Sequence, residues 1–173
     1  MKELFWDARQ GGFYFYGIDG EALIARPKEL YDGAIPSGNS VATLALQKLA
    51  DLTDDNGWGE MAERQLHFFA GEAAKYAAGY TYFMMALDYY LADKTKVVII
   101  GSMNANDTKA LIRVVGNYFL PEMMVKFYDS GEEFQDEYKV IDGKATAYVC
   151  TNFACKPPIT VGEKLAQMLK MKN

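Results

Sequence analysis

The chain has 173 residues, of which 50% are hydrophobic and 24% charged, enough apolar surface for one folded domain and too much for intrinsic disorder. Eighteen basic against 23 acidic residues give a net charge of −5, which argues against nucleic acid or an anionic membrane as a partner. No apolar run approaches the ~20 residues of a membrane span. The first residues do not resemble a secretory signal, so we expect a cytoplasmic protein.

The N-terminal part of the chain is predicted to form a short helix and a β-hairpin. Residues 1–8 are typical of the last turns of a helix, which Gly11-Gly12 ends. Phe13–Tyr16 is predicted to be a strand that turns at Asp19-Gly20 and returns over residues 22–24.

Three helices are predicted between residues 39 and 92. Apolar residues at helical spacing place them at about 39–53, 58–77 and 80–92. Ser37 or Asn39 can cap the first helix, and the short link after it makes an αα-hairpin with the second. The third helix is apolar almost all round, so we expect both of its faces to be covered.

The pattern changes to a small α/β arrangement after residue 92, which divides the chain into domains 1–92 and 93–173. Continuous apolar, largely β-branched runs are typical of buried strands, and proline pairs and capping residues separate them from helices. We predict a β-α-β-β-α layer, whose elements in chain order cover residues 96–101, 106–117, 123–128, 145–150 and 163–171. Residues 129–143, before the third strand, are polar and acidic and are predicted to form a surface excursion.

Two cysteines and one histidine limit the chemistry of this chain. Cys150 and Cys155 have a spacing unlike the C-x-x-C of thioredoxin-type centres, so they are either two reduced thiols or a disulfide or redox-sensing pair. His67 lies in a predicted helix and is either a packed or partly exposed helix residue or a catalytic base, and nothing near it in the sequence marks a nucleophile. These residues do not supply the ligands of a structural zinc site, and we expect neither a metal nor a cofactor.

The densest group of polar residues lies in the loop that enters the predicted helix at 39. Glu29 and Asp32 are paired acids that could act as general acid and base on a sugar. Free N–H groups at a helix N-terminus suit an anion or a hydroxyl-rich ligand. The ligand-binding candidates around the acids, with aromatic rings for stacking, are Arg26, Lys28, Tyr31, Ser37, Asn39 and Trp58. The alternative is a purely structural loop, in which Arg26 pairs with Glu29 or Asp32 and Asn39 is only a cap.

Three stretches of the chain carry a family resemblance. They are Arg26–Glu29 followed by Asp32–Ser40, Phe5-Trp6-Asp7 followed by Gly11-Gly12-Phe13, and Ala147–Cys150 followed by Asn152–Cys155 and Pro158. Together they resemble the C-terminal region of the thioredoxin-domain-containing family that includes spermatogenesis-associated protein 20.

The resemblance implies a mainly α fold, a part of an (α/α)6 toroid of the six-hairpin glycosidase type, with the small α/β layer as its tail. It implies that a thioredoxin-like domain and the remainder of the toroid are partners absent from this chain. The family has no established reaction, so the first expectation is a non-catalytic segment that completes a larger protein. The alternatives are a carbohydrate-active or carbohydrate-binding site on the 26–40 loop and a thiol regulator. Apolar faces stripped of such neighbours would favour a homo-oligomer.

Overall fold

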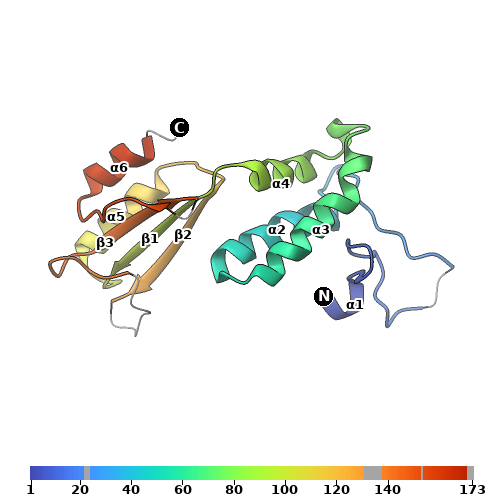
Figure 1. The fold of residues 1–173 in the computed structure, drawn as a ribbon, viewed down its shortest axis with the longest axis horizontal. Coiled ribbons are helices and arrows are strands. Elements are labelled where there is room, and N and C mark those ends of the chain that lie inside the picture. Colours follow the sequence, from blue (N-terminus) through green and yellow to red (C-terminus); the bar gives the residue numbers. More distant parts are fainter. Residues whose placement is uncertain (22–23, 131–137, 153, 171–173) are drawn as a thin grey trace. The chain divides into compact units, whose positions relative to one another are not determined.

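The chain forms two units in the computed structural model, Met1–Ala92 and Asp93–Asn173 (Figure 1). The structure describes residues 1–21, 24–130, 138–152 and 154–170. Within these ranges no helix is both long enough and apolar enough to cross a membrane.

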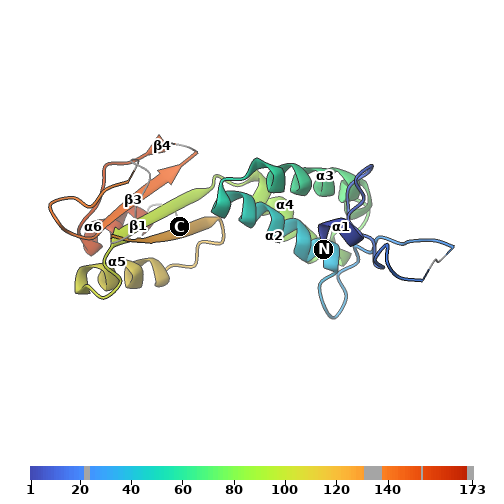
Figure 2. The same cartoon turned by 90° about the horizontal axis from the view of Figure 1, so that it is seen from below.

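Helices α2 (Gly38–Thr53) and α3 (Asn56–Ala73) form the predicted αα-hairpin (Figure 2). Ser37 caps α2 by accepting a hydrogen bond from the Ser40 N–H. Asp54 ends α2 in the left-handed conformation, and Asp55 caps α3 through the Gly57 N–H. One aspartate ends α2 and the next one begins α3, so the link between the two helices is short. The short link places the two helices side by side.

Helix α4 (Thr81–Leu91) packs mainly against α2 and follows a short 3₁₀ turn, η1 (Ala77–Gly79). Its buried face consists of Phe83, Ala86 and Tyr89. The opposite side exposes Met85 and Leu91, the latter at 72%. The expectation that both faces of this helix are covered is therefore wrong, because α2 and α3 cover only its buried face.

The predicted strand at Phe13–Tyr16 is also wrong. After α1 (Lys2–Phe5), Gly11 and Gly12 take φ values of +85° and +82° and turn the chain back on itself. Phe13 forms only an isolated bridge with Trp6, and the Phe15 N–H bonds to the Pro27 carbonyl instead of to a returning strand. Of the predicted return strand over 22–24, residues 22–23 lie outside the described ranges.

The second unit is built on a four-stranded mixed sheet with the order β2-β1-β3-β4. Its elements are β1 (Thr95–Gly101), α5 (Asn106–Gly116), β2 (Met123–Asp129), β3 (Thr146–Thr151), β4 (Ala154–Cys155) and α6 (Gly162–Lys170). The order β-α-β-β-α is as predicted, with β4 added. Most of the predicted excursion at 129–143, residues 131–137, lies outside the described ranges.

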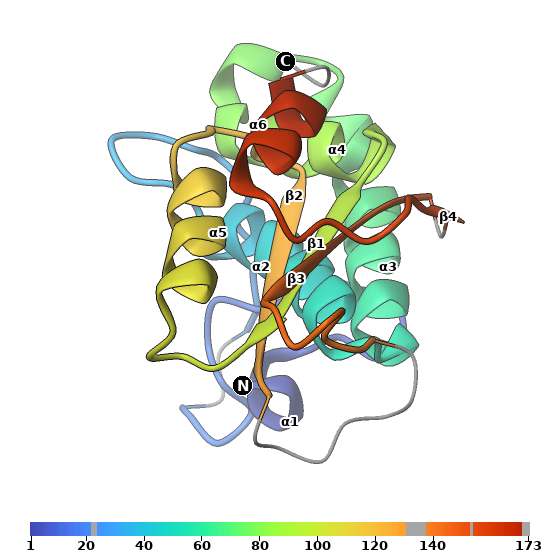
Figure 3. The same cartoon turned by 90° about the vertical axis from the view of Figure 1, so that its left-hand side faces the viewer.

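Strand β1 is the centre of this sheet. Val97 pairs in parallel with Val125 of β2 and antiparallel with Val149 of β3. Figure 3 shows α5 and α6 beside the sheet. The two helices share a hydrophobic cluster with β1 and β3, to which Ile99 and Leu165 contribute fully buried side chains. A continuous apolar run is buried on both faces here, as expected of a central strand.

The fold class is α/β, and the prediction of a mainly helical, toroid-like chain is wrong. In the part of the chain that the structure describes, six α-helices accompany the four-stranded sheet. Helix α2 contacts both α3 and α4, so the three long helices form one packed group within the first unit. Residues 93–173 have a sheet and a core of their own and are more than an appended tail.

Candidate functional site

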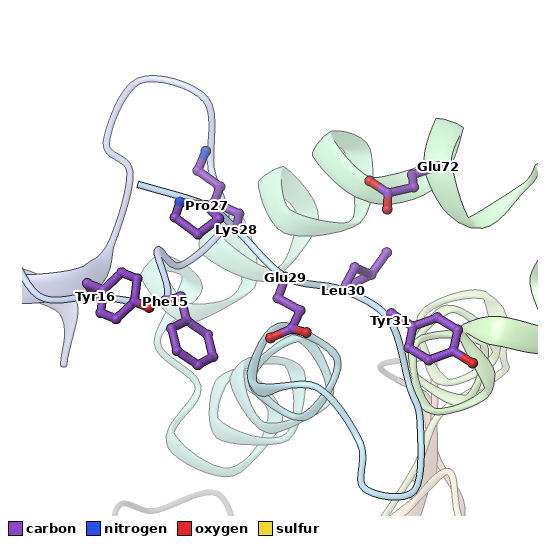
Figure 4. Close-up of a pocket in the computed structure, with 8 residues that line it drawn as sticks. All are labelled: Phe15, Tyr16, Pro27, Lys28, Glu29, Leu30, Tyr31 and Glu72. Carbon is purple, nitrogen blue, oxygen red and sulfur yellow. The ribbon is translucent and has the colours of Figure 1, made fainter. Parts of the chain in front are cut away.

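An open groove of about 450 Å³ runs beside the 26–40 loop (Figure 4). The loop supplies five of its lining residues, the segment after Gly12 supplies two, and α3 supplies one. They are Pro27, Lys28, Glu29, Leu30 and Tyr31, then Phe15 and Tyr16, then Glu72. Of the predicted site residues, the structure thus places Lys28, Glu29 and Tyr31 at one groove.

Asp32 is buried and does not reach this groove. Its Oδ1 accepts the Ser37 N–H at 2.8 Å, and its Oδ2 accepts the Tyr82 and Phe83 N–H groups at 2.9 and 3.1 Å. The Tyr82 and Phe83 N–H groups belong to the first turn of α4, where backbone N–H groups have no carbonyl partner within the helix. Asp32 therefore joins the loop to the start of α4, and its carboxylate is occupied by the backbone.

Asn39 is a second internal connection. Its side chain accepts the Phe13 N–H at 2.7 Å and donates to the carbonyl oxygens of Phe13 and Glu29 at 2.9 and 2.8 Å. Gln65 of α3 donates to the Asn39 carbonyl at 2.7 Å. The amide group holds three segments together in the buried interior, so Asn39 serves the fold and is not the cap of α2. Ser37 is that cap, and its hydroxyl also bonds to Ser40.

Lys28 pairs with Asp7, a residue that the sequence analysis did not single out. The Lys28 Nζ lies 2.7 Å from Asp7 Oδ2 and 2.6 Å from the Gly11 carbonyl. This ion pair holds the pKa of the Asp7 carboxyl well below its usual range, and N–H groups of the following turn and the Tyr14 hydroxyl act in the same direction. The hydrogen bond to Asp7, with burial, raises the pKa of Tyr14.

Arg26 binds the backbone and not the acids proposed for it. Its Nη2 donates to the Tyr16 carbonyl at 2.8 Å and to the Leu4 carbonyl at 3.3 Å, and the guanidinium lies 4.1 Å from the centroid of the Tyr14 ring. Among the described residues it forms no ion pair with Glu29 or Asp32. The predicted pairing of Arg26 with Glu29 or Asp32 is therefore wrong, because backbone carbonyl groups bind the guanidinium.

The groove itself is aromatic and acidic. Phe15, Tyr16 and Tyr31 are 58%, 44% and 57% exposed. Glu29 is exposed and lies between Phe15 and Tyr31 in Figure 4. Glu72 Oε1 accepts a hydrogen bond of 3.1 Å from the Tyr80 hydroxyl, whose pKa is raised by burial and by this bond. Flat rings beside carboxylates can hold a sugar or a cation.

Trp58 takes no part in this groove. It packs against the cluster formed by Phe13, Leu46 and Met61, between the N-terminal segment and the α2–α3 hairpin. His67 is exposed, and its Nε2 lies 3.7 Å from Glu63 on the same helix. In the described ranges no three His, Cys, Asp or Glu side chains are placed to hold a metal ion.

Cys150 and Cys155 form a disulfide. They are directly paired across β3 and β4, with their Cα atoms 3.9 Å apart. The bond therefore ties the two-residue strand β4 to the sheet. Of the two alternatives left open for this pair, the structure has the oxidised one.

Sequence reasoning missed Asp7, Gln65 and Glu72. Asp7 stood inside one of the three family-like stretches, and its place before two glycines was the available signal. Gln65 and Glu72 lie within a predicted helix, and no local sequence pattern distinguishes them from polar helix residues that face solvent. Phe15 and Tyr16 lie in the wrongly predicted strand, whose pattern gives no sign that both side chains are exposed.

The chain is homologous to spermatogenesis-associated protein 20 over nearly its whole length. It is 30% identical to the human protein, 29% to the rat protein and 28% to the mouse protein, in each case over 98% of the chain. The chain spans less than a quarter of the length of these curated relatives, 22–23% of each. No protein-family model matches it.

Proposed function

We propose that this chain is the non-catalytic part of a larger protein related to spermatogenesis-associated protein 20. The observation that carries the proposal is the binding of both Asp32 carboxylate oxygens by backbone N–H groups. A general acid must present its proton to a substrate, and a buried carboxylate saturated by three donors does not. The acid/base pair of Glu29 and Asp32 that the sequence predicts is therefore not available at the groove, and Glu72, the other carboxylate there, accepts a hydrogen bond from Tyr80.

A turnover assay tests this proposal. The chain is incubated with a panel of aryl glycosides and, for epimerisation, with free sugars followed by NMR. We expect no turnover above that of a protein-free control. Turnover that is lost in both Glu29→Gln and Asp32→Asn, while the Asp32→Asn protein remains folded by circular dichroism, would overturn it.

A second candidate function, carbohydrate binding without catalysis, is favoured by the composition of the groove. Three exposed aromatic side chains beside an exposed carboxylate are an unusual concentration of apolar surface for a solvated loop. Aromatic rings stack on the apolar faces of sugars, and carboxylates accept from hydroxyl groups. Binding that Tyr31→Ala abolishes and Trp58→Phe leaves unchanged would support this candidate, because Trp58 lies outside the groove.

A further inference from the structure

The positive charge that lines the groove, Lys28, is already bound inside the protein. The side chain of Lys28 is 7% exposed, and its ammonium contacts Asp7, the Gly11 carbonyl and, at 3.9 Å from its centroid, the Phe68 ring. Arg26 is bound to two carbonyl groups and to Tyr14. The Lys28 ammonium is therefore not available to a ligand in the groove, and Arg26 is not among the residues that line it.

The negative charges of the groove are available. Among its lining residues Glu29 and Glu72 are the acidic ones, and both are exposed. Glu72 accepts a hydrogen bond from Tyr80 through one oxygen, and a carboxylate has about four acceptor sites. The Lys28–Asp7 pair is neutral as a unit, so the groove carries the charge of its two glutamates and repels anions.

Aromatic faces complete an arrangement suited to an amine. A cation placed over an aromatic ring is attracted by the ring quadrupole, more strongly where water is excluded. The protein uses this contact internally at Phe68 and Tyr14, whereas the rings of Phe15 and Tyr31 remain open to solvent. An ammonium group could therefore contact a ring and a glutamate at once.

We propose that the groove binds a carbohydrate that carries free amino groups, with an ammonium group at Glu29 or Glu72 and an apolar sugar face on Phe15 or Tyr31. This inference rests on the carbohydrate-binding candidate described above and narrows it to one class of sugar. The same charges disfavour uronic acids and sugar phosphates.

The test compares two ligands of the same length, a glucosamine tetrasaccharide and its fully N-acetylated counterpart, by calorimetry on the whole chain at pH 6 and low salt. The first ligand is cationic and the second neutral. We expect the amine to bind about tenfold more tightly, a difference of ~1.4 kcal/mol, and to lose that advantage in high salt. Glu29→Gln and Glu72→Gln should each weaken the amine several-fold.

Glu60→Gln is the matched control, because Glu60 is an exposed glutamate of the same helix as Glu72 and does not line the groove. It should bind both ligands as the wild type does. Equal affinity for the two tetrasaccharides would overturn the amine preference and leave carbohydrate binding standing. Binding of neither would overturn both, and amine binding that neither glutamate substitution weakens would place the ligand elsewhere and overturn the inference.

Discussion

Lys28 and Asp7, 21 residues apart, form an ion pair of 2.7 Å whose side chains are only 7% and 10% exposed. The pair draws the 26–40 loop onto the turn that precedes Gly11-Gly12. The same ammonium donates to the Gly11 carbonyl. Lys28, which the sequence suggested as a ligand contact, therefore holds two loops together.

The Lys28–Asp7 ion pair should make the free energy of unfolding depend on pH. Because the pKa of Asp7 is lower in the folded than in the unfolded chain, its contribution is complete above about pH 4 and is lost as the pH falls further. Asp7→Asn should lower the free energy of unfolding by about 3 kcal/mol at pH 7 and by less at low pH. Urea unfolding between pH 2 and 7 measures this. Asp19→Asn, at an exposed position, is the control, and an equal loss at every pH would contradict the prediction.

Substitution of the two candidate acids should separate their roles. Asp32→Asn keeps the shape but presents an amide NH₂ to N–H donors, so we expect a loss of about 2 kcal/mol in the free energy of unfolding. Glu29→Gln changes an exposed side chain and should stay within about 0.5 kcal/mol of the wild type. Chemical denaturation measures both, and a neutral Asp32→Asn variant would refute the structural role.

Two glycines of positive φ should respond differently to alanine. A Cβ at Gly11 would lie 2.9 Å from the Arg64 carbonyl oxygen, whereas a Cβ at Gly143 would meet nothing within 4 Å. Gly143→Ala should cost about 1 kcal/mol for the left-handed conformation, and Gly11→Ala about 1–3 kcal/mol more for the clash. Thermal unfolding compares the two, and equal costs would show that the chain at Gly11 relaxes freely.

Reduction of the Cys150–Cys155 disulfide should destabilise the second unit modestly. The bond closes a loop with a sequence separation of 5, for which chain entropy gives about 2 kcal/mol. A thiol reductant should lower the stability of the wild type by that amount and leave Cys155→Ser unaffected. If both cysteines of the native protein react with an alkylating reagent in the absence of reductant, the disulfide is contradicted.

The sequence by itself determined most of the elements that depend on local periodicity. The α2–α3 hairpin and the strand at Thr95–Gly101 could be predicted because their apolar patterns and capping residues lie within a few residues of one another. The homology to spermatogenesis-associated protein 20 was likewise visible in three short stretches.

Only the tertiary structure decided what the polar residues of the 26–40 loop do. Asp32 meets the first turn of α4 some 50 residues later, and Asn39 meets Phe13 and Gln65, each 26 residues away. Such partners have no signature in a local pattern, because the same residue types serve equally well as ligands or as internal hydrogen-bond partners. The fold class could not be predicted for a different reason: the strands after residue 92 were visible in the apolar pattern, but only the tertiary structure shows that they form a four-stranded sheet with a core of its own.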